Sequence, residues 1–461
     1  MRGRSRGARD FGTIAPPERS VRHDGDVPPV PALASLPRPG ERRLAVRVTA
    51  DAIRNLRSGH PWLFDGSITS VNHEGAPGDL AVVFDDQRRF VAIGLWDPAS
   101  PIRVKVLHQG RPTTIDADFF RARLTDALAR RAPLIAPPVT DPPTPPTTAY
   151  RVVHGENDGL PGVVIDRYGH VLVMKLYTAA WIPHLHDLVP AVREVVPASS
   201  LVLRFSRAAL DADLHGLTEG MTLAGRPEIL DPVPFLEHGL RFEADVVHGQ
   251  KTGHFLDQRD NRIAVGARAA GARVLDVFCC NGGFGVHAAA GGARSVLSVD
   301  SSPHAIEAAV ANMARNADRP AVAACRHETI VGDAFEVLEQ LGAERRRFDV
   351  VVVDPPSFAS NAAAVPRAIA AYERLASLAA PLVEIGGLLV SASCSSRVST
   401  IDLVRAVHAG AARAGFELDE ERRTEHAMDH PVGFPEGAYL KALWSRPRRA
   451  RAAVPPFGPV R

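Results

Sequence analysis

The segment VLDVFCCNGGFGVHAAA, residues 274–290, decides the fold of the largest part of this chain. An apolar strand pattern ends in Asp276, and a turn with Gly282, Gly283 and Gly285 leads into a helical pattern. Such a turn directs backbone N–H groups and a helix N-terminus at the crevice beyond the strand. Its letters N-G-G-F-G do not form G-x-G-x-x-G, so the dinucleotide fingerprint is missing. The turn predicts a ligand site, although such glycines also serve tight packing alone.

The segments around this turn alternate between strand and helix patterns. The apolar runs SVLSVD (295–300), FDVVVVD (348–354) and GGLLVSAS (386–393) are each followed by a helical pattern. Continuous apolar strands between helices are typical of a parallel sheet that is buried on both faces. The sequence therefore predicts a doubly wound α/β domain in the C-terminal half.

Acidic residues at the ends of these strands indicate the kind of ligand. Asp300 ends the second strand, 24 residues after Asp276, where a carboxylate can accept hydrogen bonds from a ribose. Asp333 follows another predicted strand and is placed to meet an adenine amine. A cofactor with a ribose but no pyrophosphate fits this pattern, and S-adenosylmethionine is the common one.

The motif D-P-P-S-F, residues 354–358, follows the next apolar strand. Pro355 and Pro356 remove two backbone donors and stiffen the turn, so they hold Asp354 and Phe358 rigidly at the edge of the sheet. The carboxylate can accept a hydrogen bond from an exocyclic amine, and the ring can pack on a base that has left its stack. A helix-capping Asp beside a core Phe is the alternative.

Cys394 directly follows the strand pattern 386–393. A thiol in a loop at the carboxyl end of a strand is partly exposed and lies near helix dipoles, which favours the thiolate. Cys394 is therefore a candidate nucleophile, and a buried structural cysteine is the alternative. Cys279 and Cys280 are predicted to be packing residues. Four cysteines in 461 residues cannot form a disulfide scaffold, and no C-x-x-C pair predicts a metal site.

Two polar segments lie outside these strands. HGQKTGHFLDQRDNR (248–262) is expected to cap the cofactor pocket, although an exposed helix start would look similar. DHPVGFPEGAYLKALW (429–444) precedes a final strand and is either a substrate loop, which includes His430, or the turn of a β-hairpin. His184 and His186 are predicted to lie at the surface and not at a metal site.

The N-terminal half has a different organisation. Residues 1–42 mix Arg, Gly and Pro without periodicity and predict a disordered arm. Short β-branched runs between residues 44 and 107 predict a small β-barrel. A helix at 116–131, a proline-rich linker at 137–148 and several strands then predict a small α/β domain.

Composition excludes some classes of protein. Hydrophobic residues make up 45% and charged residues 23%, values typical of a soluble globular chain. No apolar stretch is long enough to span a membrane, and the N-terminus lacks the apolar core of a signal peptide, so a cytoplasmic protein is expected. The net charge of +2 is unevenly distributed, because residues 1–43 carry nine Arg against five acidic residues and residues 441–461 carry six basic residues and no acidic one. Either the nucleotide composition of the gene, which sets how often Arg codons occur, or binding to phosphate groups would explain this asymmetry.

With these motifs assembled, the chain resembles the bacterial S-adenosylmethionine-dependent large-subunit ribosomal RNA methyltransferases, the family that includes the 23S 5-methylcytosine methyltransferase I. In that family an N-terminal PUA domain carries a segment similar to LRSGHPWLFDGSI (56–68), and a central α/β domain resembles YRVVHGENDGLPGVVIDRYG (150–169). A class I methyltransferase domain carries K-T-G-x-F-L-D-Q-R-D-N-R, D-x-F-x-x-x-G-G-F, D-P-P-x-F and S-C-S. This chain has all of these motifs in the same order from about Leu44 to Trp444.

The resemblance implies a PUA-like RNA-binding domain at 43–112, a central α/β domain at 113–235 and a Rossmann-like methyltransferase domain at 236–448, followed by a basic tail at 449–461. It implies catalytic roles for Cys394, as nucleophile, and for Asp354, which would face the methyl donor and the base. The candidate cofactor-binding residues are Phe255, Asp257, Gln258, Arg259, Asp276, Phe278, Gly282, Asp300, Asp333 and Asp354. The candidate substrate-binding residues are Pro355, Pro356, Phe358 and His430.

The implied function is methylation of 23S ribosomal RNA, with carbon 5 of cytosine as the expected target. Ser357 departs from the family pattern, since methyltransferase I members carry Lys there, and this puts the target base in doubt. The alternatives are methylation of a ring nitrogen or an exocyclic amine, and a non-catalytic RNA-binding assembly factor. Ribosomal RNA is the expected partner, with no membrane and no metal ion, and a homodimer is left open.

Overall fold

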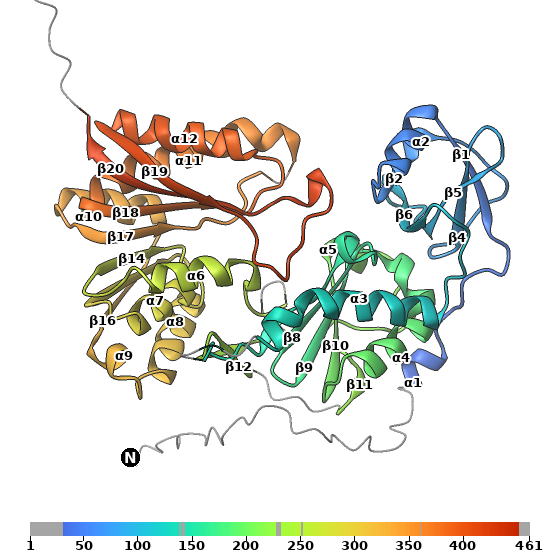
Figure 1. The fold of residues 1–461 in the computed structure, drawn as a ribbon, viewed down its shortest axis with the longest axis horizontal. Coiled ribbons are helices and arrows are strands. Elements are labelled where there is room, and N and C mark those ends of the chain that lie inside the picture. Colours follow the sequence, from blue (N-terminus) through green and yellow to red (C-terminus); the bar gives the residue numbers. More distant parts are fainter. Residues whose placement is uncertain are drawn as a thin grey trace, which may run out of the picture.

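A computed structural model describes residues 31–137, 140, 143–226, 232–249, 252–359 and 361–450. The predicted arm up to residue 30, part of the predicted linker, Lys251 and the tail beyond residue 450 lie outside the described residues. Figure 1 shows the described chain as an N-terminal sheet, a central α/β unit and a larger C-terminal α/β unit.

The N-terminal unit is a six-stranded sheet with the order β2-β6-β5-β4-β1-β3. Neighbouring strands are antiparallel except β1 and β4, and the core combines strand residues such as Leu44 and Val83 with Ile53 and Leu56 of a helix. Its elements are β1 (Leu44–Val48), α2 (Ala50–Arg57), β2 (Trp62–Phe64), β3 (Ile68–Val71), β4 (Leu80–Phe84), β5 (Phe90–Trp96) and β6 (Ile102–Gln109). The predicted apolar runs are all strands, namely β1, β4, β5 and β6, whereas the sequence did not predict α2, β2 and β3.

The central unit is a five-stranded sheet with the order β11-β10-β9-β8-β7, in which only β9 and β10 are parallel. Two helices cover one face, where Phe120 and Leu188 enter the core. Its elements are α3 (Ala117–Ile135), β7 (Ala149–His154), β8 (Val163–Tyr168), β9 (Val171–Leu176), α4 (Leu185–Val195), β10 (Ser200–Phe205), α5 (Arg207–Leu210) and β11 (Thr222–Gly225). The short helix α1 (Pro31–Ala34) precedes the N-terminal unit and lies near α4.

A β-hairpin joins the central unit to the C-terminal one. Its strands, β12 (Val233–Glu237) and β13 (Leu240–Ala244), stack Phe235 on Phe242 with ring centroids 5.7 Å apart. Phe235 also packs against Tyr168 of β8, and both belong to a core that continues into the C-terminal unit. The boundary predicted at residue 235 falls inside β12, because this hairpin belongs to a core that both units share.

The C-terminal unit is a seven-stranded sheet with the order β16-β15-β14-β17-β18-β20-β19. All neighbouring strands are parallel except β20, which is antiparallel to β18 and β19. Its strands are β14 (Arg273–Val277), β15 (Ser295–Asp300), β16 (Arg326–Val331), β17 (Phe348–Val353), β18 (Val383–Ser393), β19 (Phe416–Thr424) and β20 (Lys441–Arg449). Its helices are α6 (Arg259–Gly266), α7 (Gly283–Ala290), α8 (Pro303–Arg315), α9 (Pro320–Ala324), α10 (Ala334–Ala343), α11 (Val365–Ala379) and α12 (Thr400–Arg413).

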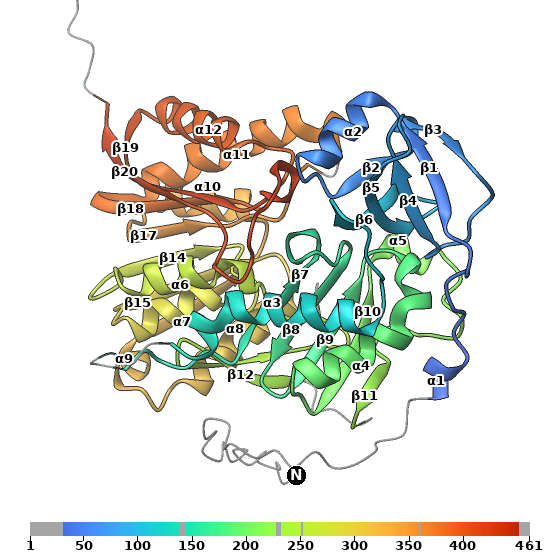
Figure 2. The same cartoon turned by 45° about the vertical axis from the view of Figure 1, so that its right-hand side comes forward.

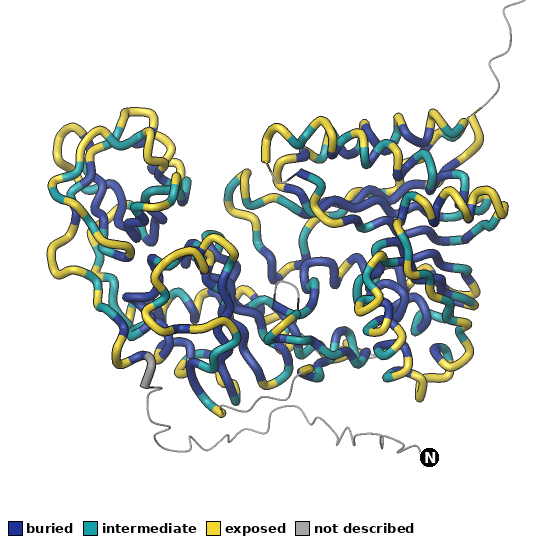
Figure 3. Tube along the Cα trace, turned by 180° about the vertical axis from the view of Figure 1, so that it is seen from behind, coloured by how far each residue is buried: buried dark blue, intermediate teal, exposed yellow. Residues whose placement is uncertain are grey.

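Both faces of this sheet are buried. In β17, Val350 and Val352 enter the core beneath α6 and α7, whereas Val351 and Val353 enter the core beneath α10, α11 and α12. The strands accordingly form the dark buried layer in Figure 3. This confirms the predicted doubly wound sheet, whose strand order reverses between β14 and β17, the usual position of a ligand crevice.

The surface position predicted for His184 is wrong. His184 is buried, and its Nε2 lies 2.7 Å from the carbonyl oxygen of Gly78 in the N-terminal unit, because that unit packs on the turn before α4. Among the described residues, no helix combines the length and apolar character that a bilayer crossing requires.

Candidate functional site

The turn between β14 and α7 has an unusual backbone. Phe278, Cys280 and Gly282 adopt positive φ angles of 63°, 51° and 77°. Left-handed backbone is uncommon for residues with a side chain and concentrates at functional sites. The turn is closed by the N–H of Gly282, which donates to the carbonyl oxygen of Cys279 at 2.8 Å. A strained, closed turn therefore stands at the reversal point of the sheet.

Replacement of Gly282 by alanine is expected to lower the free energy of unfolding by about 2 kcal/mol. A Cβ at this position would lie 2.8 Å from Cβ of Ala309 on α8, and the φ of +77° disfavours any side chain. Gly216→Ala is the matched control, since Gly216 has a φ of +82° but nothing within 4 Å of the added Cβ. Urea denaturation of both variants separates the cost of the contact with α8 from the cost of the backbone angle, and equal losses would contradict the prediction.

Asp276 lies in β14 directly before this turn and is fully buried. Its Oδ2 accepts a hydrogen bond from the N–H of Gly285 at 3.0 Å, whereas its buried Oδ1 has no partner among the described residues. Burial raises the pKa of Asp276 to about 7, and the charges of Asp354 and Asp300 add to the rise. A buried acceptor without a donor fits a ligand that supplies a positive charge, as the ammonium and sulfonium groups of S-adenosylmethionine do.

If Asp276 binds the ammonium group of S-adenosylmethionine as predicted, affinity is expected to fall roughly fivefold or more between pH 7.5 and pH 6, because the ionised carboxylate attracts that group and the protonated one does not. The pKa of about 7 in the free protein places the protonation of Asp276 inside this range. Isothermal titration calorimetry at several pH values measures the change. Asp276→Asn is expected to bind more weakly at pH 7.5 and to lose the pH dependence, and a variant that kept it would contradict the assignment to Asp276.

Asp300 and Asp333 lie at the carboxyl ends of β15 and β16, as predicted. Asp300 links the two loops beside it, since Oδ2 accepts from the N–H of Cys280 at 3.0 Å and Oδ1 from the N–H of Ser302 at 2.9 Å. Asp333 is exposed and caps α10, where its Oδ1 accepts from the N–H of Phe335 at 2.9 Å. Their roles toward a ribose and an adenine stay predictions.

The segment 252–262 lies against the β14–α7 turn. His254 Nδ1 lies 2.7 Å from Nδ2 of Asn281, which belongs to the β14–α7 turn. Asp257 and Gln258 are buried, and Nε2 of Gln258 has no hydrogen-bond partner among the described residues. Asp257 accepts a hydrogen bond from the hydroxyl of Tyr439 at 2.9 Å. The segment therefore borders the turn, and Gln258 offers it an unused buried donor.

The D-P-P-S-F motif and Cys394 come together at neighbouring strand ends. Strands β17 and β18 are parallel, with Val353 opposite Ser391. Cys394 Sγ lies 3.8 Å from the carbonyl oxygen of Pro355, and both Cys394 and Asp354 are partly exposed. Because these two strands are parallel neighbours, the two motifs lie side by side at the carboxyl edge of the sheet.

Helix α11 contacts the side chains next to Cys394 through Tyr372. The hydroxyl group of Tyr372 on α11 lies 2.8 Å from Oγ of Ser393, and its ring contacts Phe358 with centroids 5.3 Å apart. Phe358 is thus half-buried against α11, while Pro356 and Ser357 are exposed. Pro355 is buried. Contact of this motif with a substrate base stays a prediction.

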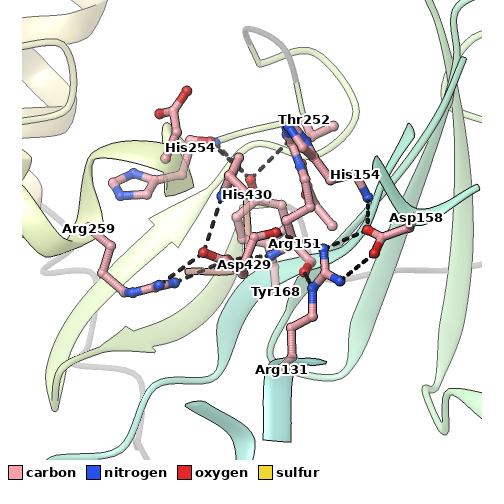
Figure 4. Close-up of polar contacts among 12 residues, drawn as sticks. Arg131, Arg151, His154, Asp158, Tyr168, Thr252, His254, Arg259, Asp429 and His430 are labelled. Carbon is pink, nitrogen blue, oxygen red and sulfur yellow. Dashed lines mark hydrogen bonds and ion pairs between the residues drawn. The ribbon is translucent and has the colours of Figure 1, made fainter. Parts of the chain in front are cut away.

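The loop between β19 and β20 carries a buried polar cluster (Figure 4). Asp429 accepts two hydrogen bonds from the guanidinium of Arg259 on α6, at 2.9 and 3.1 Å, and one from the N–H of Arg151 on β7 at 2.8 Å. Its carbonyl oxygen accepts from Arg131 on α3 at 2.8 Å. Charges on His430 and Arg259 hold the pKa of Asp429 well below its usual range despite burial. Asp429 therefore joins the central unit to the C-terminal unit.

Two predicted site residues lie in this cluster. Arg259 is buried and paired with Asp429. His430 is also buried, and its Nδ1 lies 3.1 Å from Asp429. The contacts in Figure 4 are internal to the protein, and the cofactor role of Arg259 and the substrate role of His430 stay predictions. The sequence gives no local signal for three other members of the cluster, because these residues pair across 15 to 298 positions of the chain: Arg131, Arg151 and Asp158.

The same loop and the turn after β7 both touch the N-terminal unit. Trp62 of β2 donates a hydrogen bond from Nε1 to Glu156 at 2.9 Å and packs against Phe434 with ring centroids 5.0 Å apart. Figure 2 shows this end of the N-terminal sheet beside the red loop. The next aromatic residue of β2, Phe64, is exposed. The N-terminal unit is thereby held next to the carboxyl end of the C-terminal sheet.

Two further cysteines, Cys279 and Cys280, lie in the turn between β14 and α7. Cys279 is buried, and burial raises the pKa of its thiol far above the ordinary value. Burial raises the pKa of Cys280 to about 11. Both thiols are therefore neutral near pH 7, as expected for packing residues. Among the described residues, no group of three or more His, Cys, Asp and Glu side chains is arranged to hold a metal ion.

Comparison with known proteins gives matches over most of the chain. Residues 215–445 match the S-adenosylmethionine-dependent methyltransferase family, and residues 46–109 match a PUA-like domain. A ribosomal RNA large subunit methyltransferase of Deinococcus radiodurans is 46% identical over 89% of this chain and 99% of its own length. A ribosomal RNA large subunit methyltransferase I of Salmonella arizonae is 34% identical over 85% of this chain and 95% of its own.

Solved structures agree on the architecture. A Streptococcus mutans protein named as a SAM-dependent methyltransferase matches with a TM-score of 0.73 at 20% identity, over 87% of this chain and 99% of its own. A second structure, named as a methyltransferase complexed with SAH, also has a TM-score of 0.73, at 21% identity over 88% of this chain and 99% of its own. At these identities the likeness establishes the fold, which is the predicted combination of a PUA-like sheet and a methyltransferase sheet.

Proposed function

Since the chain belongs to the S-adenosylmethionine-dependent methyltransferase family, together with relatives named ribosomal RNA large subunit methyltransferases, we propose that it methylates carbon 5 of a cytosine in large-subunit ribosomal RNA. The single observation that supports this choice of atom is the position of Cys394. Its Sγ lies 3.8 Å from the carbonyl oxygen of Pro355, next to Asp354 at the carboxyl edge of the sheet. A thiol beside a carboxylate provides a nucleophile and a hydrogen-bond acceptor for one pyrimidine.

The residues around the β14–α7 turn would hold the cofactor. Asp276 would accept from its ammonium group through Oδ1, and Asp300 would accept from its ribose. When bound, S-adenosylmethionine supplies an electrophilic methyl group and leaves as S-adenosylhomocysteine. Asp354 would orient the cytosine through its amine or ring nitrogen, and Phe358 would border the base.

Carbon 5 of cytosine is a poor nucleophile, and the proposed role of Cys394 is to activate it. The thiolate adds to carbon 6, so an Sγ–C6 bond forms and the electron pair of the C5–C6 double bond moves to carbon 5, which takes the methyl group. A base then removes the carbon 5 proton and the double bond re-forms. The Sγ–C6 bond breaks as it does so, and the thiolate is returned. Atoms and electrons balance over these reaction steps without an oxidant, a reductant or a metal ion.

The N-terminal unit would bind RNA away from the reacting base. RNA is recognised largely by shape, backbone contacts and stacking on aromatic side chains. The exposed ring of Phe64, beside Trp62 and His60, offers such a stacking surface close to the methyltransferase unit. Because the proposed substrate is bacterial ribosomal RNA, the proposed site of activity is the cytoplasm.

Nucleoside mass spectrometry tests the proposal. Unmodified 23S RNA, free or in assembled large subunits, would be incubated with the protein and S-adenosylmethionine, digested and compared with 5-methylcytidine. The expected product is 5-methylcytidine at one site. A methyl group on a ring nitrogen or an exocyclic amine would overturn the thiol mechanism, although the protein would still be an RNA methyltransferase. Substitution of the exposed Ser357 would then be the first test of which residue selects the base.

A further inference from the structure

A buried ammonium group lies against the loop that carries Cys394. Lys441 is the first residue of β20 and pairs with Ser393 of β18. Its Nζ donates hydrogen bonds to the carbonyl oxygens of Ser395 and Val398, and the residue is only 5% exposed. The ammonium is thereby held by the backbone that directly follows Cys394.

This ammonium lacks a carboxylate partner. Among the described residues, no acidic side chain forms an ion pair with Lys441. Lys105 is the contrast, since it is equally buried but pairs with Asp97 at 2.7 Å. Isolated buried charges are costly, and buried lysines are normally paired. Two carbonyl oxygens neutralise only part of the charge of Lys441, so the site favours a further negative charge.

Cys394 is the group placed to supply that charge. Burial lowers the pKa of Lys441 to about 8, and the charge of Cys394 opposes this shift and favours the ammonium. By reciprocity, the ammonium must favour the thiolate of Cys394 by the same interaction. At pH 7 most of Lys441 still carries its proton, so the positive charge is present where the nucleophile is needed.

We propose that Lys441 is a positioning residue that keeps Cys394 in the thiolate form by holding an unpaired positive charge against the Cys394 loop. This inference rests on the proposed function, in which Cys394 is the nucleophile. It gives a role to a residue that the sequence placed in the segment 429–444 without assigning it one.

The other titratable groups around Cys394 do not replace Lys441. Burial raises the pKa of Tyr372 on α11 to about 12 and lowers that of His426 before β20 to about 4, so both are neutral near pH 7. Asp354 carries a negative charge that opposes a thiolate. Arg397 is exposed to water, which screens its charge. The carboxylate of Asp402 on α12 accepts a hydrogen bond from the hydroxyl of Ser399, the N-cap of that helix, and the N–H of Asp402 donates to the same hydroxyl.

The pH dependence of Cys394 alkylation tests this proposal in the protein without RNA or cofactor. Iodoacetamide reacts with thiolates, and peptide mass spectrometry follows Cys394 separately from Cys325, which serves as the internal reference. In the native protein the midpoint for Cys394 is expected below the ordinary thiol value of about 8.5. In Lys441→Met it is expected to rise by about one pH unit, so that the alkylation rate at pH 7 falls about tenfold. Lys441→Arg is expected to keep the low midpoint.

Methylation kinetics provide the second readout. In Lys441→Met the acidic limb of the pH profile of kcat is expected to shift to higher pH by the same amount as the Cys394 midpoint. The KM for RNA is expected to stay unchanged. A folded Lys441→Met protein with an unshifted Cys394 midpoint would overturn the proposal, even if its activity fell. If that variant failed to fold, a midpoint at or above 8.5 in the native protein would overturn it equally. Undiminished methylation by Cys394→Ser would instead overturn the proposed function, and the alkylation midpoints would still decide the role of Lys441.

Discussion

Cys394→Ser is expected to lower kcat for RNA methylation by at least about a thousandfold, because a serine hydroxyl stays protonated and cannot add to carbon 6 at a useful rate. The affinity for S-adenosylmethionine is expected to change less than about twofold, since the proposed cofactor contacts come from Asp276 and Asp300 on the neighbouring strands. Single-turnover methylation and calorimetry measure the two quantities on the same preparation.

Cys325→Ser is the matched control for the loss of a thiol. Cys325 precedes β16 at the opposite end of that strand from Asp333, and it is partly exposed like Cys394. Its replacement is expected to leave kcat unchanged. Full methylation by Cys394→Ser would show that no thiol adduct forms, and it would favour attack on the methyl group by a ring nitrogen or an exocyclic amine.

Asp429→Asn is expected to lower the free energy of unfolding by about 3 kcal/mol, the cost of leaving a buried charge without its partner. The amide removes the negative charge that Arg259 contacts through two hydrogen bonds, while side-chain size is kept. Arg259 retains its contact with Asp260, so the expected cost lies at the low end for buried ion pairs. Urea denaturation of the whole chain measures the loss.

Glu339→Ala provides the comparison for an ion pair at the surface. Glu339 pairs with Arg374 at 2.8 Å, but both side chains are more than half exposed, so the expected loss is below about 1 kcal/mol. A loss for Asp429→Asn as small as that for Glu339→Ala would show that the cluster in Figure 4 does not hold the two units together.

The same cluster predicts a loss of stability in acid. The pKa of Asp429 is lower in the folded chain than its ordinary value of 3.8, so its stabilising contribution is fully present above about pH 4 and is lost as the pH falls toward the folded value. In Asp429→Asn this part of the acid sensitivity is expected to disappear.

The sheet of the C-terminal unit could be predicted because each strand carries its own signal. Strand β17 carries four consecutive apolar residues, Val350 to Val353. Since successive side chains point to opposite faces, such a run is expected only where both faces of the strand are buried, and both faces are covered in the structure. The meeting of Asp354 and Cys394 could be predicted for a related reason, since the carboxyl ends of parallel neighbours lie at one edge.

Contacts between the units could not be predicted in this way. The turn that contains His184 looks polar and exposed along the sequence, yet the N-terminal unit covers it and Gly78 contacts the ring. The hairpin β12–β13 likewise gave no sign that Phe235 would pack on Tyr168 of β8 and also stack on Phe242, which lies beyond the predicted boundary. Periodicity reports which face of an element is apolar, but not which other unit will cover it.

The amino-acid sequence by itself determined the class of the protein, the position of its cofactor turn and the identity of its candidate nucleophile, because glycine turns, apolar strands and the residues that end them act over a few positions of the chain. Only the tertiary structure decided that Asp429 pairs with Arg259 and that the ammonium of Lys441 lies against the Cys394 loop. These pairings join residues 46 to 170 positions apart. The attraction in such pairs is strong only where water is excluded, which requires distant segments of the chain to pack together first.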